Sequence, residues 1–167
     1  MSHVTSVDPV EELRVRIDLV DLYAEYASAL DDNRLDDWLG LFVEDASYRI
    51  VSRENWDRGL PLMTVWCESR AAMQDRARAI RETQMFTSRW LRHLVGPVRV
   101  TSAGPPPLDV EASYAVFETL PDEQTRVLSV GRYSDRIVRD ADGTLRFADK
   151  VCVYDSVLIP TSLVYPL

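Results

Sequence analysis

Histidine and cysteine, the side chains that most often serve as bases, nucleophiles and metal ligands, are scarce in this chain. Its 167 residues include two histidines and two cysteines. His3 lies in an N-terminal segment of small polar residues that we expect to fray, so His93 is the best candidate for a general base or proton relay. The nearby cations Arg89 and Arg92 would lower its basicity, and the sequence indicates no carboxylate partner for it. We therefore interpret His93 as a structural, hydrogen-bonded residue.

Counting the possible ligands tests for metal centres. A Rieske cluster needs two cysteines and two histidines, and a mononuclear non-haem iron needs two histidines and a carboxylate. The chain supplies neither set, and Cys67 and Cys152 each lie in an apolar run, where a free thiol behaves as a small buried side chain. A glycine-rich phosphate loop, a nucleophile-elbow serine and a Cys-x-x-Cys motif are also missing. We predict no catalytic, cofactor-binding or metal-binding residues in this chain.

Asp31, Asp32, Asp36 and Asp37 form a dense acidic cluster. They coincide with the predicted end of one helix and the start of the next, where aspartate caps backbone amides. We therefore expect capping and solvation rather than metal binding.

The charge balance excludes some partners. The formal net charge is −8 and the pI is near 4.8, so no basic face is available for nucleic acid or an anionic membrane. Uncharged stretches fall short of the roughly 18 to 20 apolar residues that a membrane span needs, and no signal peptide is apparent. We expect a soluble, cytoplasmic protein.

Helices are predicted in the first half of the chain. Asp8 followed by Pro9 is typical of a helix start, and this helix should run to about Asp31. A second, shorter helix should carry Leu35 to Phe42, and a third should run from Ser69 to about Phe86. Apolar spacings of three and four predict the buried stripe of the first helix, which comprises Leu13, Ile17, Val20, Ala24 and Ala27, widened by Leu19, Tyr23, Tyr26 and Leu30.

Strand-like segments fill the remainder. Two are expected at 46–53 and 62–68, separated by a loop at 54–59, and four long ones follow at 93–101, 108–120, 125–139 and 144–159. Turn signals between the last strands favour an antiparallel meander. Helices first and a long-stranded sheet last predict an α+β fold with three N-terminal helices packed in a strongly curved, mainly antiparallel sheet. We assign one domain, 1–167, with residues 1–7 as a flexible tail.

Several segments, in order and with consistent spacing, resemble the small (β) subunits of aromatic-ring-hydroxylating dioxygenases, the Rieske non-haem iron oxygenases. The likeness covers nearly the whole chain, although Lys150 replaces an expected arginine and Gly96 a common asparagine. The segments that carry it are Tyr48–Asn55 with Gly59-Leu60, Glu68-Ser69-Arg70 with Asp75-Arg76, Arg92–Val95 with Val98 and Val100, Gly131–Asp135, and Asp155–Ser162.

The resemblance implies a cone-shaped α+β fold of the nuclear-transport-factor-like or cystatin-like kind. It also implies a non-catalytic, structural subunit. In this family a separate catalytic α subunit holds the Rieske 2Fe-2S cluster, the mononuclear Fe(II) and the substrate pocket, commonly in an assembly of three α and three β chains. Electrons arrive from NAD(P)H through a reductase, with or without a ferredoxin. The reaction would be cis-dihydroxylation of an aromatic ring, and the tail favours benzoate-like substrates such as anthranilate or terephthalate.

Such an assembly must bury surface between subunits, and interfaces favour arginine and tryptophan over lysine. Eighteen of the nineteen cationic residues are arginine. We predict that Trp56, Arg58, Trp90 and Arg92 contribute to subunit contacts. The competing interpretation places the tryptophans in the core and the arginines in solvent.

Two other functions stay open. A stand-alone cone-fold isomerase, dehydratase or hydrolase would use His93 with a carboxylate as an acid–base pair. An oligomerising scaffold outside the dioxygenases would need no site at all.

Overall fold

The described helices lie in the first half of the chain together with the strands β1 and β2, and the other strands lie in the second half. The computed structural model describes residues 8–82, 89–102, 104–156 and 163–167; the predicted tail, 1–7, lies outside this range. The elements in chain order are α1 (Pro9–Asp31), α2 (Leu35–Gly40), β1 (Phe42–Ser52), α3 (Arg53–Asp57), β2 (Val65–Cys67), α4 (Arg70–Glu82), β3 (Trp90–Val95), β4 (Arg99–Val100), β5 (Leu108–Thr119), β6 (Arg126–Arg139) and β7 (Leu145–Tyr154).

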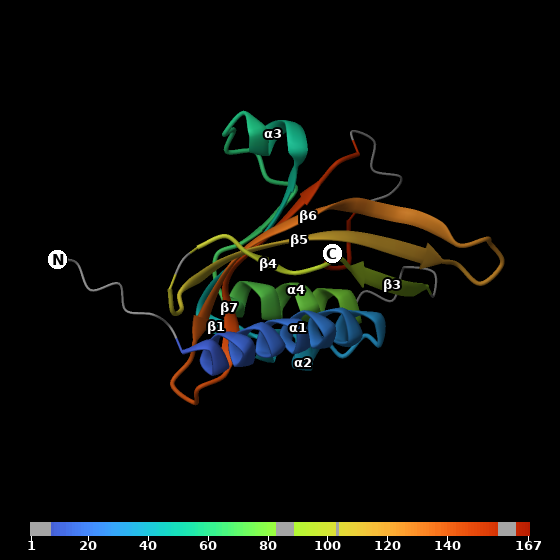
Figure 1. Ribbon diagram of the computed structural model, residues 1–167. Helices are drawn as coiled ribbons and strands as arrows, with labels where there is room; N and C mark the ends of the chain where they lie inside the picture. Colours follow the sequence, from blue (N-terminus) through green and yellow to red (C-terminus); the bar gives the residue numbers. More distant parts are fainter. Residues whose placement is uncertain (1–7, 83–88, 103, 157–162) are drawn as a thin grey trace.

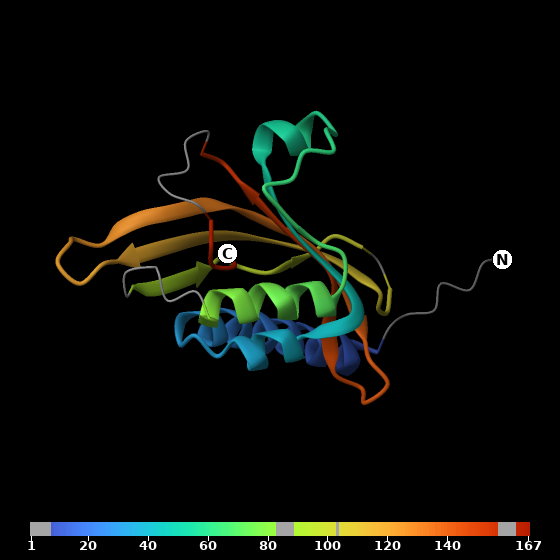
Figure 2. The same ribbon diagram turned by 180° about the vertical axis from the view of Figure 1, so that it is seen from behind.

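One curved sheet covers the helices. Its strand order is β2-β1-β7-β6-β5-β3, and β4 pairs with β5. Figures 1 and 2 show the long strands β5 and β6 curving over a layer formed by α1, α2 and α4, with α3 on the opposite side of the sheet. The arrangement confirms the predicted α+β fold and the antiparallel meander of β5, β6 and β7.

The pairing of β1 with β7 is parallel, unlike the meander. Phe42 at the start of β1 is in register with Phe147, and the amide of Phe147 donates to the carbonyl of Leu41 at 2.9 Å. The second predicted helix therefore ends earlier than expected, because Phe42 belongs to the sheet. Strands β1 and β7 can pair in parallel because a long stretch of chain, and not a short turn, connects them.

Helix α1 begins as predicted but buries only part of the predicted stripe. The amide of Val10 donates to Asp8 at 3.0 Å, which is an N-cap. Leu13, Ile17 and Val20, which were expected in the core, are 59%, 52% and 58% exposed. The helix turns its larger aromatic stripe inward, because burying tyrosine rings removes more apolar surface from water than burying valine or alanine does. The buried residues are Leu19, Leu22, Tyr23, Tyr26, Ala29 and Leu30.

Two further predictions change locally. The expected loop at 54–59 contains the short helix α3, which Ser52 caps by accepting the Asn55 amide at 3.3 Å. The third predicted helix is α4, whose described part ends at Glu82; residues 83–88 lie outside the described range. Within the described part of the chain, no helix is long and apolar enough to cross a membrane.

Candidate functional site

His93 has a carboxylate partner that its sequence neighbours do not suggest. It lies on β3, its side chain is fully buried, and its Nδ1 is 2.7 Å from Oδ1 of Asp31. The backbone amide of His93 also donates to the same carboxylate, at 2.9 Å to Oδ1 and 3.2 Å to Oδ2. Asp31 is the last residue of α1, 62 positions earlier, so the pair ties the end of this helix to the strand.

This contact corrects the expectation for Asp31. Its side chain is 6% exposed and binds β3 instead of capping its own helix. Asp36 and Asp37 do lie exposed in the first turn of α2, paired with Arg81 and Arg34. A carboxylate this distant in sequence becomes a neighbour only through tertiary packing.

The other ring nitrogen of His93 faces no partner. In the tautomer that donates from Nδ1 to the carboxylate, the second ring nitrogen is Nε2, on the opposite side of the ring. Nε2 is buried and makes no hydrogen bond within the described residues. The pair thus has the orientation of an acid–base unit, although the imidazole has no solvent exposure.

A second buried charge pair lies inside the curve of the sheet. Nζ of Lys150 is 2.8 Å from Oδ2 of Asp135, and both side chains are fully buried. The hydroxyl of Tyr23 donates to the same oxygen at 2.5 Å, and the amide of Val151 donates to Oδ1 at 3.1 Å. The carboxylate is therefore satisfied on both oxygens, which favours a structural role.

The C-terminal residues fill the remaining interior. Leu167 is fully buried, and its carbonyl oxygen accepts hydrogen bonds from the Tyr26 hydroxyl and, at 3.3 Å, from the Cys152 thiol. Its amide donates to the Tyr48 hydroxyl at 2.9 Å. Figures 1 and 2 both place this end of the chain between the sheet and the helices. Leu167 therefore packs within the buried core of the described residues.

Burial favours the protonated forms of the thiol and the tyrosine hydroxyls in this interior. It raises the pKa of Cys152 to about 12 and raises the pKa values of Tyr26 and Tyr48 well above their ordinary range. Burial also raises the pKa of Asp135, although the neighbouring Lys150 partly offsets that effect. A thiol with a raised pKa is a poor nucleophile. Both Cys67 and Cys152 are free and buried, which confirms the prediction made for them.

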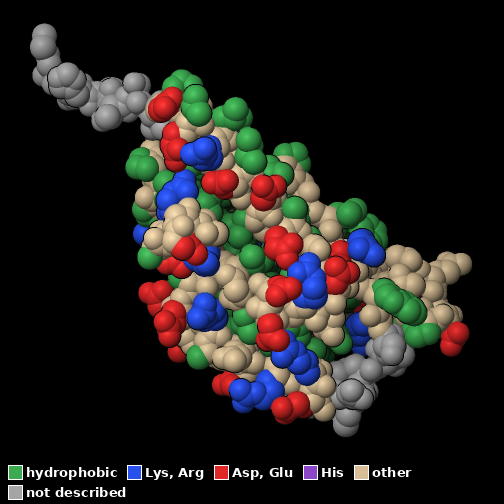
Figure 3. All heavy atoms as spheres, turned by 90° about the horizontal axis from the view of Figure 1, so that it is seen from below, with side chains coloured by type: hydrophobic (Ala, Val, Ile, Leu, Met, Phe, Trp, Pro, Cys, Tyr) green, Lys and Arg blue, Asp and Glu red, His purple; other side chains and the backbone are tan. Residues whose placement is uncertain are grey.

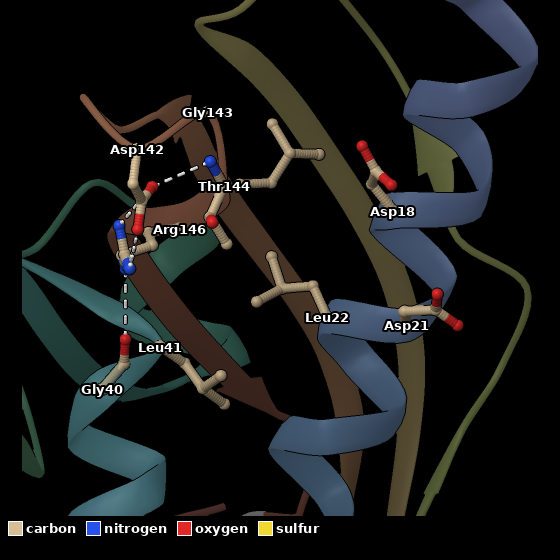
Figure 4. A pocket seen from close by; sticks show the side chains of 10 residues that line it. Asp18, Asp21, Leu22, Gly40, Leu41, Asp142, Gly143, Thr144 and Arg146 are labelled. Atoms are coloured by element: carbon tan, nitrogen blue, oxygen red, sulfur yellow. Dashed lines mark hydrogen bonds and ion pairs between the residues drawn. The ribbon is translucent and has the colours of Figure 1, made fainter.

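A surface pocket of about 400 Å³ lies between α1, the end of α2 and the β6–β7 turn, and Figure 4 shows the side chains that line it. Arg146 donates to Asp142 at 2.7 and 3.0 Å and to the carbonyl of Gly40 at 3.2 Å. Its hydrogen bonds lower the pKa of Asp142. Since the guanidinium is committed to these contacts, Arg146 holds the β6–β7 turn against the end of α2, and Asp18 and Asp21 of α1 also line the pocket.

The segments that carry the family resemblance hold the fold together. Ser69 accepts the amide of Ala72 at 3.2 Å at the start of α4, and Arg76 donates to the carbonyl of Leu163 at 2.6 Å. A side chain at Gly131 would place its Cβ 2.0 Å from the carbonyl oxygen of Val153. Residues 157–162 of the last such segment lie outside the described range.

The residues predicted at subunit contacts lie in two different settings. Trp90 and Arg92 are 59% and 68% exposed on β3. Arg58 is also exposed and pairs with Glu54 at 3.0 Å, whereas Trp56 is partly buried. Trp56 packs on the outer face of the sheet, against the cluster Val51, Val151 and Val153. The role of these four residues in subunit contacts stays a prediction.

No group of three or more histidine, cysteine, aspartate or glutamate residues that could hold a metal ion occurs among the described residues. The ligand sets of a Rieske cluster and of a mononuclear iron do not fit this part of the chain. We therefore assign no step of iron chemistry to these residues.

Comparisons with known proteins agree with the architecture. Residues 25–161 match the family model described as the ring hydroxylating beta subunit. The anthranilate 1,2-dioxygenase small subunit of Burkholderia cepacia is 31% identical over 157 residues, which cover 94% of this chain and 97% of the relative. The terephthalate 1,2-dioxygenase terminal oxygenase component subunit beta 2 of a Comamonas species is 27% identical over 151 residues, covering 90% and 97%.

Solved structures show the same fold. A crystal structure assigned as the beta subunit of an aromatic-ring-hydroxylating dioxygenase from Novosphingobium aromaticivorans superimposes with a TM-score of 0.84 and 35% identity, covering 93% of this chain and 99% of that one. A naphthalene 1,2-dioxygenase structure reaches a TM-score of 0.76 at 15% identity, covering 98% and 89%, and so shows the fold alone. This chain belongs to the ring-hydroxylating β-subunit family and is the β subunit of an aromatic-ring-hydroxylating dioxygenase.

Proposed function

We propose that this chain is the structural subunit of an oxygenase component and supports the assembly of catalytic α subunits. The observation that carries the proposal is the interior of the fold. Side chains and the buried Leu167 occupy the space under the sheet, and the buried charges of Lys150 and Asp135 are paired with each other. A chain organised in this way contributes a rigid body with exposed surfaces for partners.

In the proposed complex the α subunit supplies the Rieske cluster and the mononuclear iron, which together add both atoms of dioxygen to an aromatic ring. This chain contributes contacts to that subunit and to other β subunits, and a reductase acts on the α subunit alone. An assembly of three α and three β chains fits the family resemblance.

Aromatic carboxylates are the proposed substrate class. Two of the relatives described above are subunits of anthranilate and terephthalate dioxygenases. Both substrates are benzoates with one further substituent, so a benzoate-like ring fits both. Substrate choice would lie with the α subunit, because it holds the iron.

Coexpression with a catalytic α subunit of this dioxygenase family from the same source tests the proposal. We expect a red-brown complex of fixed stoichiometry that converts benzoate, anthranilate or terephthalate faster than uncharged naphthalene. If the chain purifies alone and colourless from such cells while the α subunit is soluble, the assembly role is wrong. If the complex forms but prefers naphthalene, only the substrate class is wrong.

One observation favours a second candidate function, acid–base catalysis at His93. Asp31 orients the imidazole and leaves Nε2 without a partner among the described residues. An isolated chain that dehydrated a β-hydroxy ketone, with the activity lost in both His93→Gln and Asp31→Asn, would support this candidate. The imidazole argues against it, because its side chain has no solvent exposure, although His93 is among the residues that line a groove of about 530 Å³ between α1 and β3.

A further inference from the structure

A short segment beyond the last strand enters the interior. Residues 163–167, which we call the strap, belong to no helix and pair with no described strand of the sheet. Pro166 and Leu167 are nevertheless buried, on the inner face of the helix layer. The outer face of that layer, seen in Figure 3, carries acidic, basic and hydrophobic side chains interspersed. The strap therefore fills a space whose walls are built by other elements.

Three donors on three elements converge on one oxygen of the strap. The hydroxyl of Tyr26 on α1 donates to the main-chain oxygen of Leu167, and the hydroxyl of Tyr48 on β1 lies 3.3 Å from that oxygen. The thiol of Cys152 on β7 also lies 3.3 Å from it. All three residues are fully buried. Because the donors belong to the helix layer and to two strands, the fold sets their arrangement and the strap does not.

Aromatic rings surround these donors. The ring of Trp38 meets the ring of Tyr48 edge-on, with the centroids 5.5 Å apart. Tyr26 contacts Phe42 and Phe147 in the same manner, at 6.5 and 5.5 Å. Burial raises the pKa values of Tyr26 and Tyr48, so both hydroxyls keep their protons and stay donors. Apolar walls with a few convergent polar groups are the usual composition of a small-molecule site.

The strap is also held by contacts outside this donor set. Arg76 on α4 donates to the carbonyls of Leu163 and Val164, at 2.6 and 3.0 Å. The guanidinium of Arg89 lies 5.5 Å from the centre of the Tyr165 ring. A change at Arg76 can therefore loosen the strap while the donors on α1, β1 and β7 stay in place.

We propose that Tyr26, Tyr48 and Cys152 form a binding site for a small aromatic molecule that carries an acceptor oxygen, and that the strap occupies this site as an internal ligand. A carbonyl and a carboxylate both supply such an oxygen. The ring of Pro166 and the side chain of Leu167 together have the bulk of a fused two-ring compound. The strap is tethered beside the site, so it competes at a high effective concentration. The site belongs to this chain alone and does not rest on the proposed function.

A chain shortened by residues 163–167 exposes the site, and circular dichroism with thermal melting verifies that it folds. Titration calorimetry compares the ketone 1-tetralone with tetralin, a hydrocarbon that has the same ring skeleton and no oxygen. We expect 1-tetralone to bind one-to-one and about 10-fold or more tightly than tetralin, because tetralin leaves buried donors without an acceptor. Tighter binding of 1-naphthoate than of 1-tetralone would assign the oxygen to a carboxylate, and weaker binding would assign it to a carbonyl.

The two tyrosine hydroxyls are tested in the shortened chain. Tyr26→Phe and Tyr48→Phe should each reduce the preference for 1-tetralone over tetralin by about threefold or more, with the affinity for tetralin unchanged. The matched control Tyr114→Phe removes a buried hydroxyl whose partner is Ser129, at 3.1 Å, and should keep the preference. The same preference in all three variants would overturn the proposal, because the hydroxyls would then not recognise the oxygen.

The full-length chain supplies an independent test. Arg76→Met should bind 1-tetralone about threefold or more tightly than the unmodified chain, because the apparent affinity rises with the fraction of molecules whose strap has left the site. Arg78→Met, at an exposed position on the same helix, should not change the affinity. If the shortened chain does not fold, this comparison alone decides. A folded shortened chain that binds no 1-tetralone, or no gain in Arg76→Met, overturns the proposal and leaves the strap as part of the core.

Discussion

The ammonium group of Lys150 lies 3.2 Å from the centre of the Tyr133 ring and 2.8 Å from the carboxylate of Asp135. Both contacts are fully buried, and the rings of Tyr23, Tyr26 and Phe147 also lie within 5 Å of Nζ. The only lysine of the chain is thus surrounded by negative ring faces and one counter-ion.

Lys150→Met should lower the free energy of unfolding by about 3 to 5 kcal/mol, because it leaves the Asp135 charge buried without a counter-ion. Chemical denaturation of the isolated chain measures the loss. The double variant Lys150→Met/Asp135→Leu should recover most of it, since both charges are then gone. A double variant as unstable as the sum of two single losses would contradict this account.

His93→Gln should reduce stability by about 1 to 3 kcal/mol, because Asp31 loses a buried donor. In a fully assembled, iron-replete complex the variant should keep most of the turnover, as expected for a structural residue. Steady-state kinetics of the variant and unmodified complexes compare their turnover rates. A loss of about 10² to 10⁴ in rate with assembly intact would identify His93 as a base instead.

Trp90→Ala and Arg92→Ala should weaken association in the assembled complex without changing the fold. An interface tryptophan or arginine often contributes about 2 kcal/mol or more to binding. Mass measurement at nanomolar dilution compares these variants with Arg58→Ala, predicted to act alike, and with Arg99→Ala, an exposed control paired with Glu111 at 2.5 Å. Complexes of unchanged mass and thermal stability would remove Trp90, Arg92 and Arg58 from the interface.

The purified, isolated chain should hold less than stoichiometric iron after chelator treatment. The reason is the shortage of histidine and cysteine: two of each in the whole sequence. Metal analysis by mass spectrometry gives the content directly, and the coexpressed complex is the positive control. Tightly held, stoichiometric iron in the lone chain would show that a ligand set had been overlooked.

Stability should fall as the pH rises from 9 toward 12, in part through Cys152. Burial raises the pKa of this thiol from 9.0 to about 12. Above pH 9 the unfolded chain therefore releases a proton that the folded chain keeps, which favours unfolding by up to about 1.4 kcal/mol per pH unit. Chemical denaturation at pH 9 and pH 10 should show that the free energy of unfolding falls less with pH in Cys152→Ala than in the unmodified chain. An equal fall in both proteins would mean that burial does not raise the pKa of the Cys152 thiol.

Much of the fold was predictable from local patterns. The Asp8-Pro9 helix start, the β6–β7 turn and the alternation of buried residues in β5 and β6 depend on neighbours close in sequence. The scarcity of ligand residues and the family resemblance also required no coordinates. These features follow from the backbone preferences and side-chain types of short segments.

Tertiary structure alone decided which surfaces meet. The predicted apolar stripe of α1 covers most of its girth, and the sequence could not show that Leu13 and Ile17 would stay exposed while Tyr23 and Tyr26 are buried. The partner of His93 was equally hidden, since Asp31 lies 62 residues away. Periodicity reports that a face is apolar, but which element covers it depends on the summed burial of the whole chain. Contacts between distant residues are set by that global packing, and no local pattern encodes them.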